Sequence, residues 1–162
     1  MKKEDILSKN HPARLNPEWT FEYAGKLYYN PGVPEAMNYS IDSIMEVVRN
    51  YDIDGVHMDD YFYPYPVKGE KLPDWKTYLK YGKKFSIAVD WRRDNVNKFI
   101  KTLDYKIKKE KPNVEFGISP FGVWRNYTRD KSGSKTKAGI TNYDNLYANT
   151  RKWIDEGWID YI

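Results

Sequence analysis

Two neighbouring carboxylates, Asp59 and Asp60, stand at the end of a short segment whose apolar pattern, over residues 53–59, predicts a β-strand. Because side chains alternate between the two faces of a strand, His57 and Asp59 share one face and Met58 lies on the other. If the polar face lines a ligand site, Asp59 lies at its rim and can act as a nucleophile or as a general acid. Asp60 has the opposite parity, so it either turns inward or accepts backbone N–H bonds in the following loop.

His57 can orient a neighbouring carboxylate, contact a substrate or ligate a metal ion. A metal site is disfavoured, because such sites usually include a second histidine and the other one, His11, lies in a polar N-terminal stretch. Nucleophilic serine chemistry is also disfavoured, since Ser119 lacks the Gly-x-Ser-x-Gly pattern of a nucleophile elbow. No glycine-rich phosphate loop follows any predicted strand. We therefore predict carboxylate chemistry that needs neither a cofactor nor a metal.

The composition excludes several other classes of protein. The 162 residues contain no cysteine, which excludes a disulfide scaffold, a thiolate zinc site and a cysteine nucleophile. The net charge of +4 is small and scattered, so we predict no nucleic-acid partner. No apolar run approaches the ~20 residues of a membrane-spanning helix, and the polar start at Met1 does not resemble a signal peptide. We therefore predict no membrane insertion.

Three helix–strand pairs would position the candidate residues. Apolar spacings of three and four predict helices at 35–50, 89–110 and 143–154, and each is followed after a short turn by a predicted strand, at 53–59, 114–119 and 158–162. A fourth strand is predicted at 26–30. The connections that run from strand to helix are much longer than those from helix to strand. In parallel α/β folds the ligand site lies at the carboxyl ends of the strands, so these long loops should carry it.

The long loops are rich in aromatic residues, in a chain with 15 Tyr and 6 Trp against 6 Phe. Such rings either pack into a small core under the loops or face a ligand, and we expect some of them to face a ligand. Carboxylates beside many Tyr and Trp, without thiols, metal-binding histidines or phosphate loops, are typical of glycoside hydrolysis by paired acids.

Five sequence blocks, in order, are similar to blocks of one known family. They are Tyr29–Glu35, Asp54–Pro64, Trp91–Val96, Gly117–Gly122 and Trp153–Ile162. Over roughly residues 11–162 the chain resembles the glycosyl hydrolase-like 10 family of bacterial proteins. The resemblance implies a TIM-barrel fold, hydrolysis of a bacterial polysaccharide or glycan, and a parent protein that is exported.

The resemblance also implies that Asp59 and Asp60 are the site carboxylates, with His57 beneath them. The residues that we expect to contact substrate are His57, Tyr61, Tyr63, Arg92, Asn95, Ser119 and Trp124. Arg92 could instead be a paired helix charge. Trp124 could instead pack the loop, although an indole face also suits the apolar side of a sugar ring.

We classify the chain as α/β, with residues 1–162 forming a single incomplete TIM-barrel domain that is truncated at both ends. A complete barrel takes about 250 residues, and the predicted strands supply about half of one. Unpaired sheet edges would favour self-association. Hydrolysis also needs two facing carboxyls, whereas Asp59 and Asp60 point apart. The second acid is either absent or one of Glu70, Asp74, Asp130 and Asp160. The alternatives are a non-catalytic carbohydrate-binding remnant and an inactive fragment.

Overall fold

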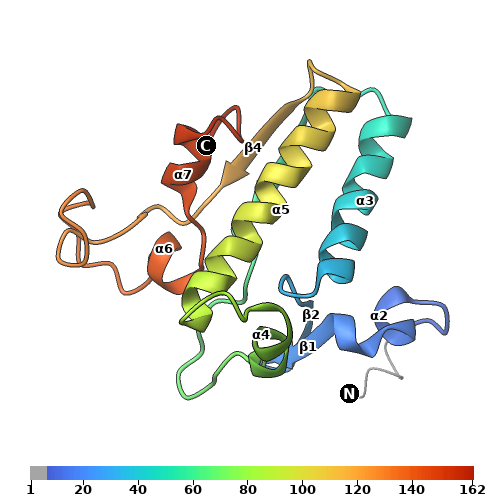
Figure 1. Ribbon diagram of the computed structural model, residues 1–162. Coiled ribbons are helices and arrows are strands. Elements are labelled where there is room, and N and C mark those ends of the chain that lie inside the picture. Colours follow the sequence, from blue (N-terminus) through green and yellow to red (C-terminus); the bar gives the residue numbers. More distant parts are fainter. Residues whose placement is uncertain (1–6) are drawn as a thin grey trace.

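The computed structural model describes residues 7–162, which form a mixed α/β arrangement in which two long helices lie side by side against a small parallel sheet (Figure 1). The helical elements are α2 (Pro12–Leu15), the 3-10 helix η1 (Pro17–Trp19), α3 (Pro34–Asn50), α4 (Trp75–Tyr81), α5 (Ala88–Glu110), α6 (Asn142–Asn145) and α7 (Thr150–Asp155). The strands are β1 (Thr20–Tyr23), β2 (Lys26–Tyr29), β3 (Gly55–Asp59) and β4 (Glu115–Ser119).

The two long helices, α3 and α5, confirm the predictions made from apolar spacing. Pro34 occupies the first turn of α3, where its missing N–H costs no hydrogen bond. The buried side chains of α3 recur at helical spacing, and those of α5 meet them in one core. Ile41 and Ile100 have no exposed surface, and each such side chain contributes roughly 1.5–3 kcal/mol by burial.

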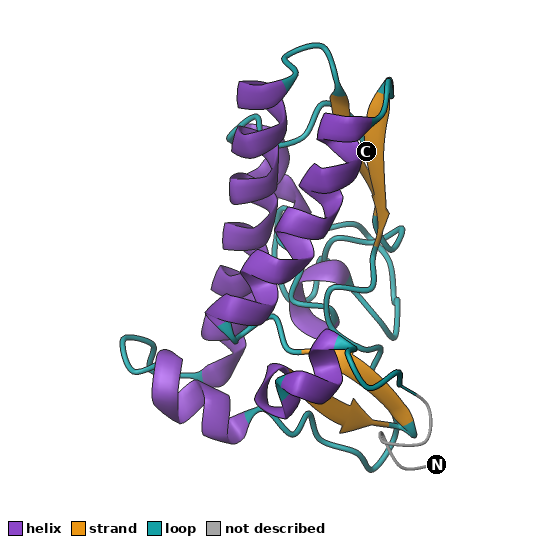
Figure 2. Ribbon diagram, turned by 90° about the vertical axis from the view of Figure 1, so that its right-hand side faces the viewer, coloured by secondary structure: helices purple, strands orange, loops and turns teal. Residues whose placement is uncertain are grey.

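Strands β3 and β4 pair in parallel, and α5 forms the crossover between them. In this register His57 lies opposite Gly117, and Asp59 lies opposite Ser119. The apolar side chains of both strands pack against the helices, which lie on one side of the sheet (Figure 2). The other face carries the polar side chains of the strands, and His57, Asp59 and Ser119 are exposed there.

The third helix–strand pair differs from the prediction. The expected helix at 143–154 is divided into α6 and α7, and Tyr147 between them has a φ of 58°, which an α-helix cannot contain. The expected strand at 158–162 makes only an isolated parallel bridge, between Tyr161 and Gly117. This bridge nevertheless places residues 158–162 beside β4, on the side away from β3.

Asp160 fastens this last segment to β4. Its carboxylate accepts hydrogen bonds from the backbone N–H of Phe116 and from Nζ of Lys108, both at 2.6 Å. Burial alone would raise the pKa of Asp160, but these two hydrogen bonds outweigh it, so the pKa is lowered. Asp160 is therefore a structural carboxylate at this point of the sheet.

The strand predicted at 26–30 exists as β2, but it pairs antiparallel with β1 in a separate two-stranded sheet. Ala24 and Gly25 form the tight turn of this hairpin, both with positive φ. The α/β class is therefore confirmed, and each described sheet has two strands. Within residues 7–162, no helix is long and apolar enough to cross a membrane.

Candidate active site

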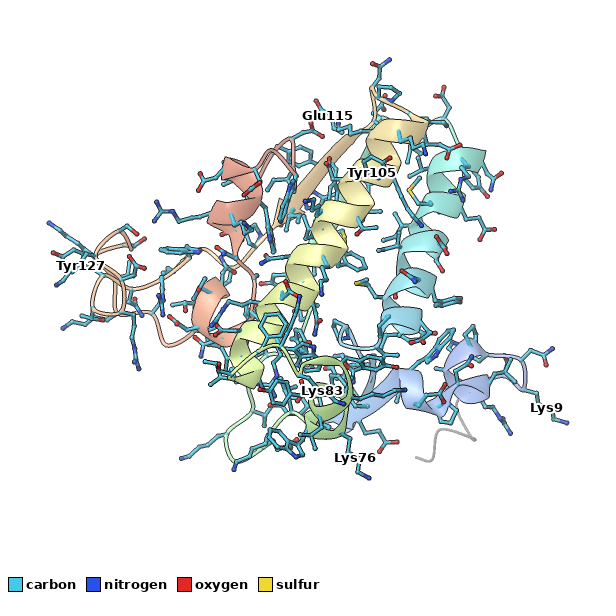
Figure 3. The ribbon with its side chains drawn as sticks, viewed as in Figure 1. Lys9, Lys76, Lys83, Tyr105, Glu115 and Tyr127 are labelled. Atoms are coloured by element: carbon cyan, nitrogen blue, oxygen red, sulfur yellow. The ribbon has the colours of Figure 1, made fainter. Side chains whose placement is uncertain are left out.

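Asp59 lies at the carboxyl end of β3, on the polar face of the sheet that the helices leave open. Its side chain is exposed, and its Oδ1 accepts a 3.3 Å hydrogen bond from the backbone N–H of Asp60. Ser119, which pairs with Asp59 in the parallel register, ends β4 at the same end of the sheet. Glu115 marks the opposite, amino end of β4 (Figure 3). The expected parity of this strand is confirmed, since Val56 and Met58 face the helical core.

His57 is held from both sides by hydroxyl groups. Its Nε2 lies 2.8 Å from Oγ of Ser119, and its Nδ1 lies 3.0 Å from the hydroxyl of Tyr161. The Tyr161 ring also stacks on the imidazole, with 5.7 Å between the ring centroids. Tyr161 was not among the site residues expected from the sequence. Gly117 is the signal that could have found it, because a glycine within a strand can mark the close approach of another group.

The direction of these hydrogen bonds follows from the acidity of the two hydroxyls. A phenol donates more readily than an aliphatic hydroxyl, so we expect the Tyr161 hydroxyl to donate to Nδ1 of His57. His57 then donates from Nε2 to Ser119, and the Ser119 hydrogen is left to point at another acceptor. Asp59 is the neighbour of Ser119 on this face, so the arrangement can supply a hydrogen bond to that carboxylate or to a ligand held there.

Gly117 makes this arrangement possible, and a Gly117→Ala variant should disrupt it. A Cβ at this position would lie 2.0 Å from Cζ of Tyr161, so the ring must move away from His57. We expect the ¹⁵N resonances of the His57 ring to change, as they should in Tyr161→Phe, which removes the hydroxyl alone. Gly122→Ala is the matched control, because nothing lies within 4 Å of its added Cβ. Unchanged His57 resonances in Gly117→Ala would contradict the assignment.

Asp60 is buried, with 6% of its surface exposed, and its Oδ2 accepts a short hydrogen bond from the Tyr65 hydroxyl. Burial, and next this bond, raise the pKa of Tyr65. Asp60 thus turns inward and fastens the loop that follows β3. Tyr61, the next residue in the chain, is largely exposed, and its ring lies 5.5 Å from that of Tyr65.

Tyr63 and Asn95 lie inside the core rather than at a surface. Tyr63 has no exposed area, and its hydroxyl accepts a 3.3 Å hydrogen bond from Nδ2 of the buried Asn95. Its ring packs edge-on against Tyr147 at 5.1 Å, and burial raises the pKa of Tyr63. In this structure the two residues hold the loop against α5. Tyr63 presents no surface to a ligand, in contrast to the expectation that it contacts substrate, and Asn95 keeps 7% of its surface exposed.

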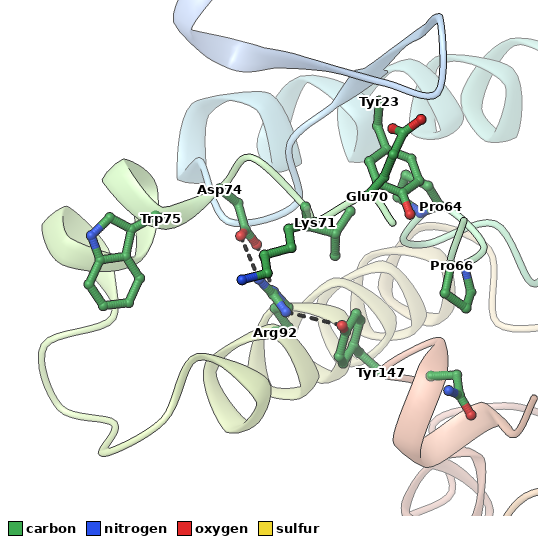
Figure 4. Close-up of a pocket in the computed structure, with 11 residues that line it drawn as sticks. Tyr23, Pro64, Pro66, Glu70, Lys71, Asp74, Trp75, Arg92 and Tyr147 are labelled. Carbon is green, nitrogen blue, oxygen red and sulfur yellow. Dashed lines mark hydrogen bonds and ion pairs between the residues drawn. The ribbon is translucent and has the colours of Figure 1, made fainter. Parts of the chain in front are cut away.

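Arg92, on the first turns of α5, forms a two-bond ion pair with Asp74 at 2.6 and 2.8 Å. It also donates a 3.0 Å hydrogen bond to the Tyr147 hydroxyl (Figure 4). Burial alone would lower the pKa of Arg92, but Asp74 outweighs it and raises that pKa, so the guanidinium stays charged. These side chains line a pocket of about 510 Å³.

Trp124 lies half-buried in the long loop between β4 and α6, whose far end carries Tyr127 (Figure 3). The Arg151 guanidinium lies 4.6 Å from the centre of its ring, and Tyr143 packs against it at 5.6 Å. Its indole N–H is buried and makes no hydrogen bond within the described part of the chain. Packing within the loop therefore occupies part of the surface on which a sugar ring could stack.

The candidate second acids are engaged in structural contacts. Glu70 accepts a hydrogen bond from the backbone N–H of Ala24, Asp130 pairs with Arg125, and Asp74 and Asp160 have the partners described above. Burial counts against Asp74 in particular, since 1% of its surface is exposed. Among residues 7–162, no group of three or more His, Asp or Glu side chains is placed to hold a metal ion.

The comparisons with known proteins agree with the resemblance seen in the sequence. The model of the family described as glycosyl hydrolase-like 10 matches residues 1–162. The chain is 59% identical over 157 residues to glycosyl hydrolase YngK of Bacillus subtilis (strain 168). The aligned region covers 96% of this chain and 31% of that relative. It is 43% identical over 145 residues to glycosyl hydrolase DigH of Escherichia coli (strain K12), covering 90% of this chain and 33% of that relative. The chain thus spans 31% to 33% of the length of these relatives, and it belongs to the glycosyl hydrolase-like 10 family.

Proposed function

We propose that this chain is part of a glycoside hydrolase in which Asp59 is a catalytic carboxylate. The observation that carries the proposal is the exposed Asp59 at the carboxyl end of a parallel sheet, on the face left open by the helices. In parallel α/β enzymes catalytic groups stand at this end of the strands. Membership of a glycosyl hydrolase-like family supplies the class of reaction.

In this proposal Asp59 serves as a nucleophile or as a general acid in the cleavage of a bacterial polysaccharide or glycan. His57 holds Ser119 through the hydrogen bond described above, and the Ser119 hydroxyl in turn donates to Asp59 or to the substrate. Arg92, Tyr61 and Trp124 remain the proposed contacts to more distant sugar units. Asp60 supports the site by holding the loop, and neither a cofactor nor a metal takes part.

The second acid of the pair comes, in this proposal, from outside the described sheet. The two carboxyls of a glycoside hydrolase lie ~5 to ~9.5 Å apart across the substrate. Further strands beside β3 and beside residues 158–162 would close the sheet into the proposed TIM barrel and could carry that acid opposite Asp59. Pairing of the same free edges between two copies of the chain is the alternative arrangement.

Two measurements on the full-length protein test the function. The release of reducing ends from a panel of bacterial polysaccharides measures hydrolysis, and calorimetric titration with oligosaccharides measures binding. Product release supports the enzyme. Binding without product supports a non-catalytic carbohydrate-binding role, which the engagement of the described acids in structural contacts would explain. If neither binding nor product is found, both proposals are wrong.

A further inference from the structure

The pocket that Arg92 and Asp74 line lies where the β1–β2 hairpin, the loop after β3, the starts of α4 and α5 and the end of α6 converge (Figure 4). Its volume of about 510 Å³ is within the range of small-molecule sites. The residues that line it are Tyr23, Pro64, Pro66, Glu70, Lys71, Leu72, Asp74, Trp75, Arg92, Asn145 and Tyr147. We call this region the hairpin pocket.

The charges of the hairpin pocket cancel. Two basic residues, Lys71 and Arg92, face two acidic ones, Glu70 and Asp74, and the Arg92 guanidinium is already paired with Asp74. A pocket with no net charge gains little from a strongly charged ligand, which would lose its hydration on entering. The electrostatics therefore favour an uncharged, polar ligand.

The same pocket offers hydrogen-bonding groups beside an aromatic ring. Asn145 uses its Oδ1 to accept bonds from Thr141, while its amide nitrogen and Nζ of Lys71 donate no hydrogen bond within residues 7–162. Trp75 stands at one end of the pocket, with 59% of its surface exposed, and Tyr23 and Pro66 stand at the other (Figure 4). An exposed indole together with free donors suits a ring that has an apolar face and polar edges.

The backbone at Tyr147 supports a ligand-binding role for the hairpin pocket. Its positive φ breaks the expected helix, and the resulting position lets its hydroxyl accept the hydrogen bond from Arg92. A non-glycine residue in this conformation costs of order 1–3 kcal/mol, and such residues cluster at active sites and ligand clamps. Here the residue in the unfavourable conformation, Tyr147, also lines the pocket.

We propose that the hairpin pocket is a binding subsite for an uncharged saccharide unit, stacked on Trp75 and hydrogen-bonded by Asn145 and Lys71. The inference rests on the proposed function, because it takes the ligand to be part of the substrate. Pro64 and Pro66 flank Tyr65, whose hydroxyl holds Asp60 beside Asp59. One loop therefore forms a wall of this subsite and adjoins the strand end that carries the catalytic carboxylate. Binding energy from this remote unit can position the bond to be cleaved.

Direct binding to the full-length protein tests the subsite, with an Asp59→Asn background to prevent turnover. We expect neutral cello- and chito-oligosaccharides to bind in calorimetry, and Trp75→Ala to weaken that binding about tenfold by loss of the stacking surface. Trp75→Phe should restore most of the affinity. Tyr105→Ala is the matched control, since Tyr105 is a similarly exposed ring on a distant part of α5 (Figure 3).

The outcomes separate the subsite from the enzymatic function. If the protein with Asp59 intact cleaves polysaccharide but Trp75→Ala binds and cleaves as the parent does, the subsite is wrong and the function stands. Oligosaccharide binding that depends on Trp75, without any cleavage by the protein, supports the subsite and contradicts the enzyme. Equal weakening by Tyr105→Ala, or tighter binding of acidic oligogalacturonate than of the neutral sugars, would overturn the subsite.

Discussion

An Asp59→Asn variant of the full-length protein is expected to lose turnover by about 10²- to 10⁴-fold, the usual contribution of a positioned proton-transferring group. The amide has nearly the same shape as the carboxylate but can neither donate a proton as an acid nor attack a sugar carbon. Folding should be retained, because Asp59 is exposed and its described hydrogen bond comes from the neighbouring amide. The measurement is the rate of reducing-end release at saturating substrate.

Asp52→Asn provides the matched control for this variant. Asp52 is an exposed carboxylate that precedes the amino end of β3, so it has the same chemistry at the opposite end of the same strand. Its substitution should leave turnover unchanged. Full activity in Asp59→Asn, with thermal unfolding like that of the parent, would mean that another residue is the catalytic carboxylate.

Asp74→Ala should lower the free energy of unfolding by about 3–5 kcal/mol, the usual cost of breaking a buried ion pair by removing one partner. The Arg92 side chain is 15% exposed, and without Asp74 its charge would keep Tyr147, through its hydroxyl and its ring, as the described partner. Urea denaturation measures the change. Because these residues line the hairpin pocket, oligosaccharide binding should weaken as well.

A double-mutant cycle shows whether the cost comes from the buried charge. Replacing Arg92 with Met in the Asp74→Ala background removes that charge and should recover a large part of the lost stability. Asp42→Ala is the surface control, since Asp42 pairs with Lys106 while 60% exposed, and it should cost at most about 1 kcal/mol. A loss in Asp74→Ala no larger than in Asp42→Ala would contradict the role given to the pair.

The parts of the fold that follow from local pattern could be predicted from the sequence. Helices α3 and α5 were predictable because their apolar side chains recur at the helical period over many turns. Strands β3 and β4 were predictable because short apolar runs follow those helices after tight turns. The period of two then placed His57 and Asp59 on one face without any tertiary information.

The remainder depends on contacts between segments far apart in the chain. The helix break at Tyr147 accompanies its contacts with Arg92 and Tyr63, which no local pattern reveals. Tyr63 and Asn95 look like loop and rim residues in the sequence, but the fold brings them together in the core. The role of Tyr161 depends on the clearance at Gly117, which becomes visible only when residues 158–162 lie beside β4.

The β1–β2 hairpin is tied to the loop after β3 by two hydrogen bonds, from Val67 N–H to the Tyr23 hydroxyl and from Ala24 N–H to Glu70. Both Tyr23 and Glu70 are also walls of the hairpin pocket. A molecule that shifted the hairpin would therefore change the affinity of that pocket. Thermodynamic linkage makes such an effect reciprocal, so a ligand in the pocket would change the affinity of the hairpin for that molecule by the same factor.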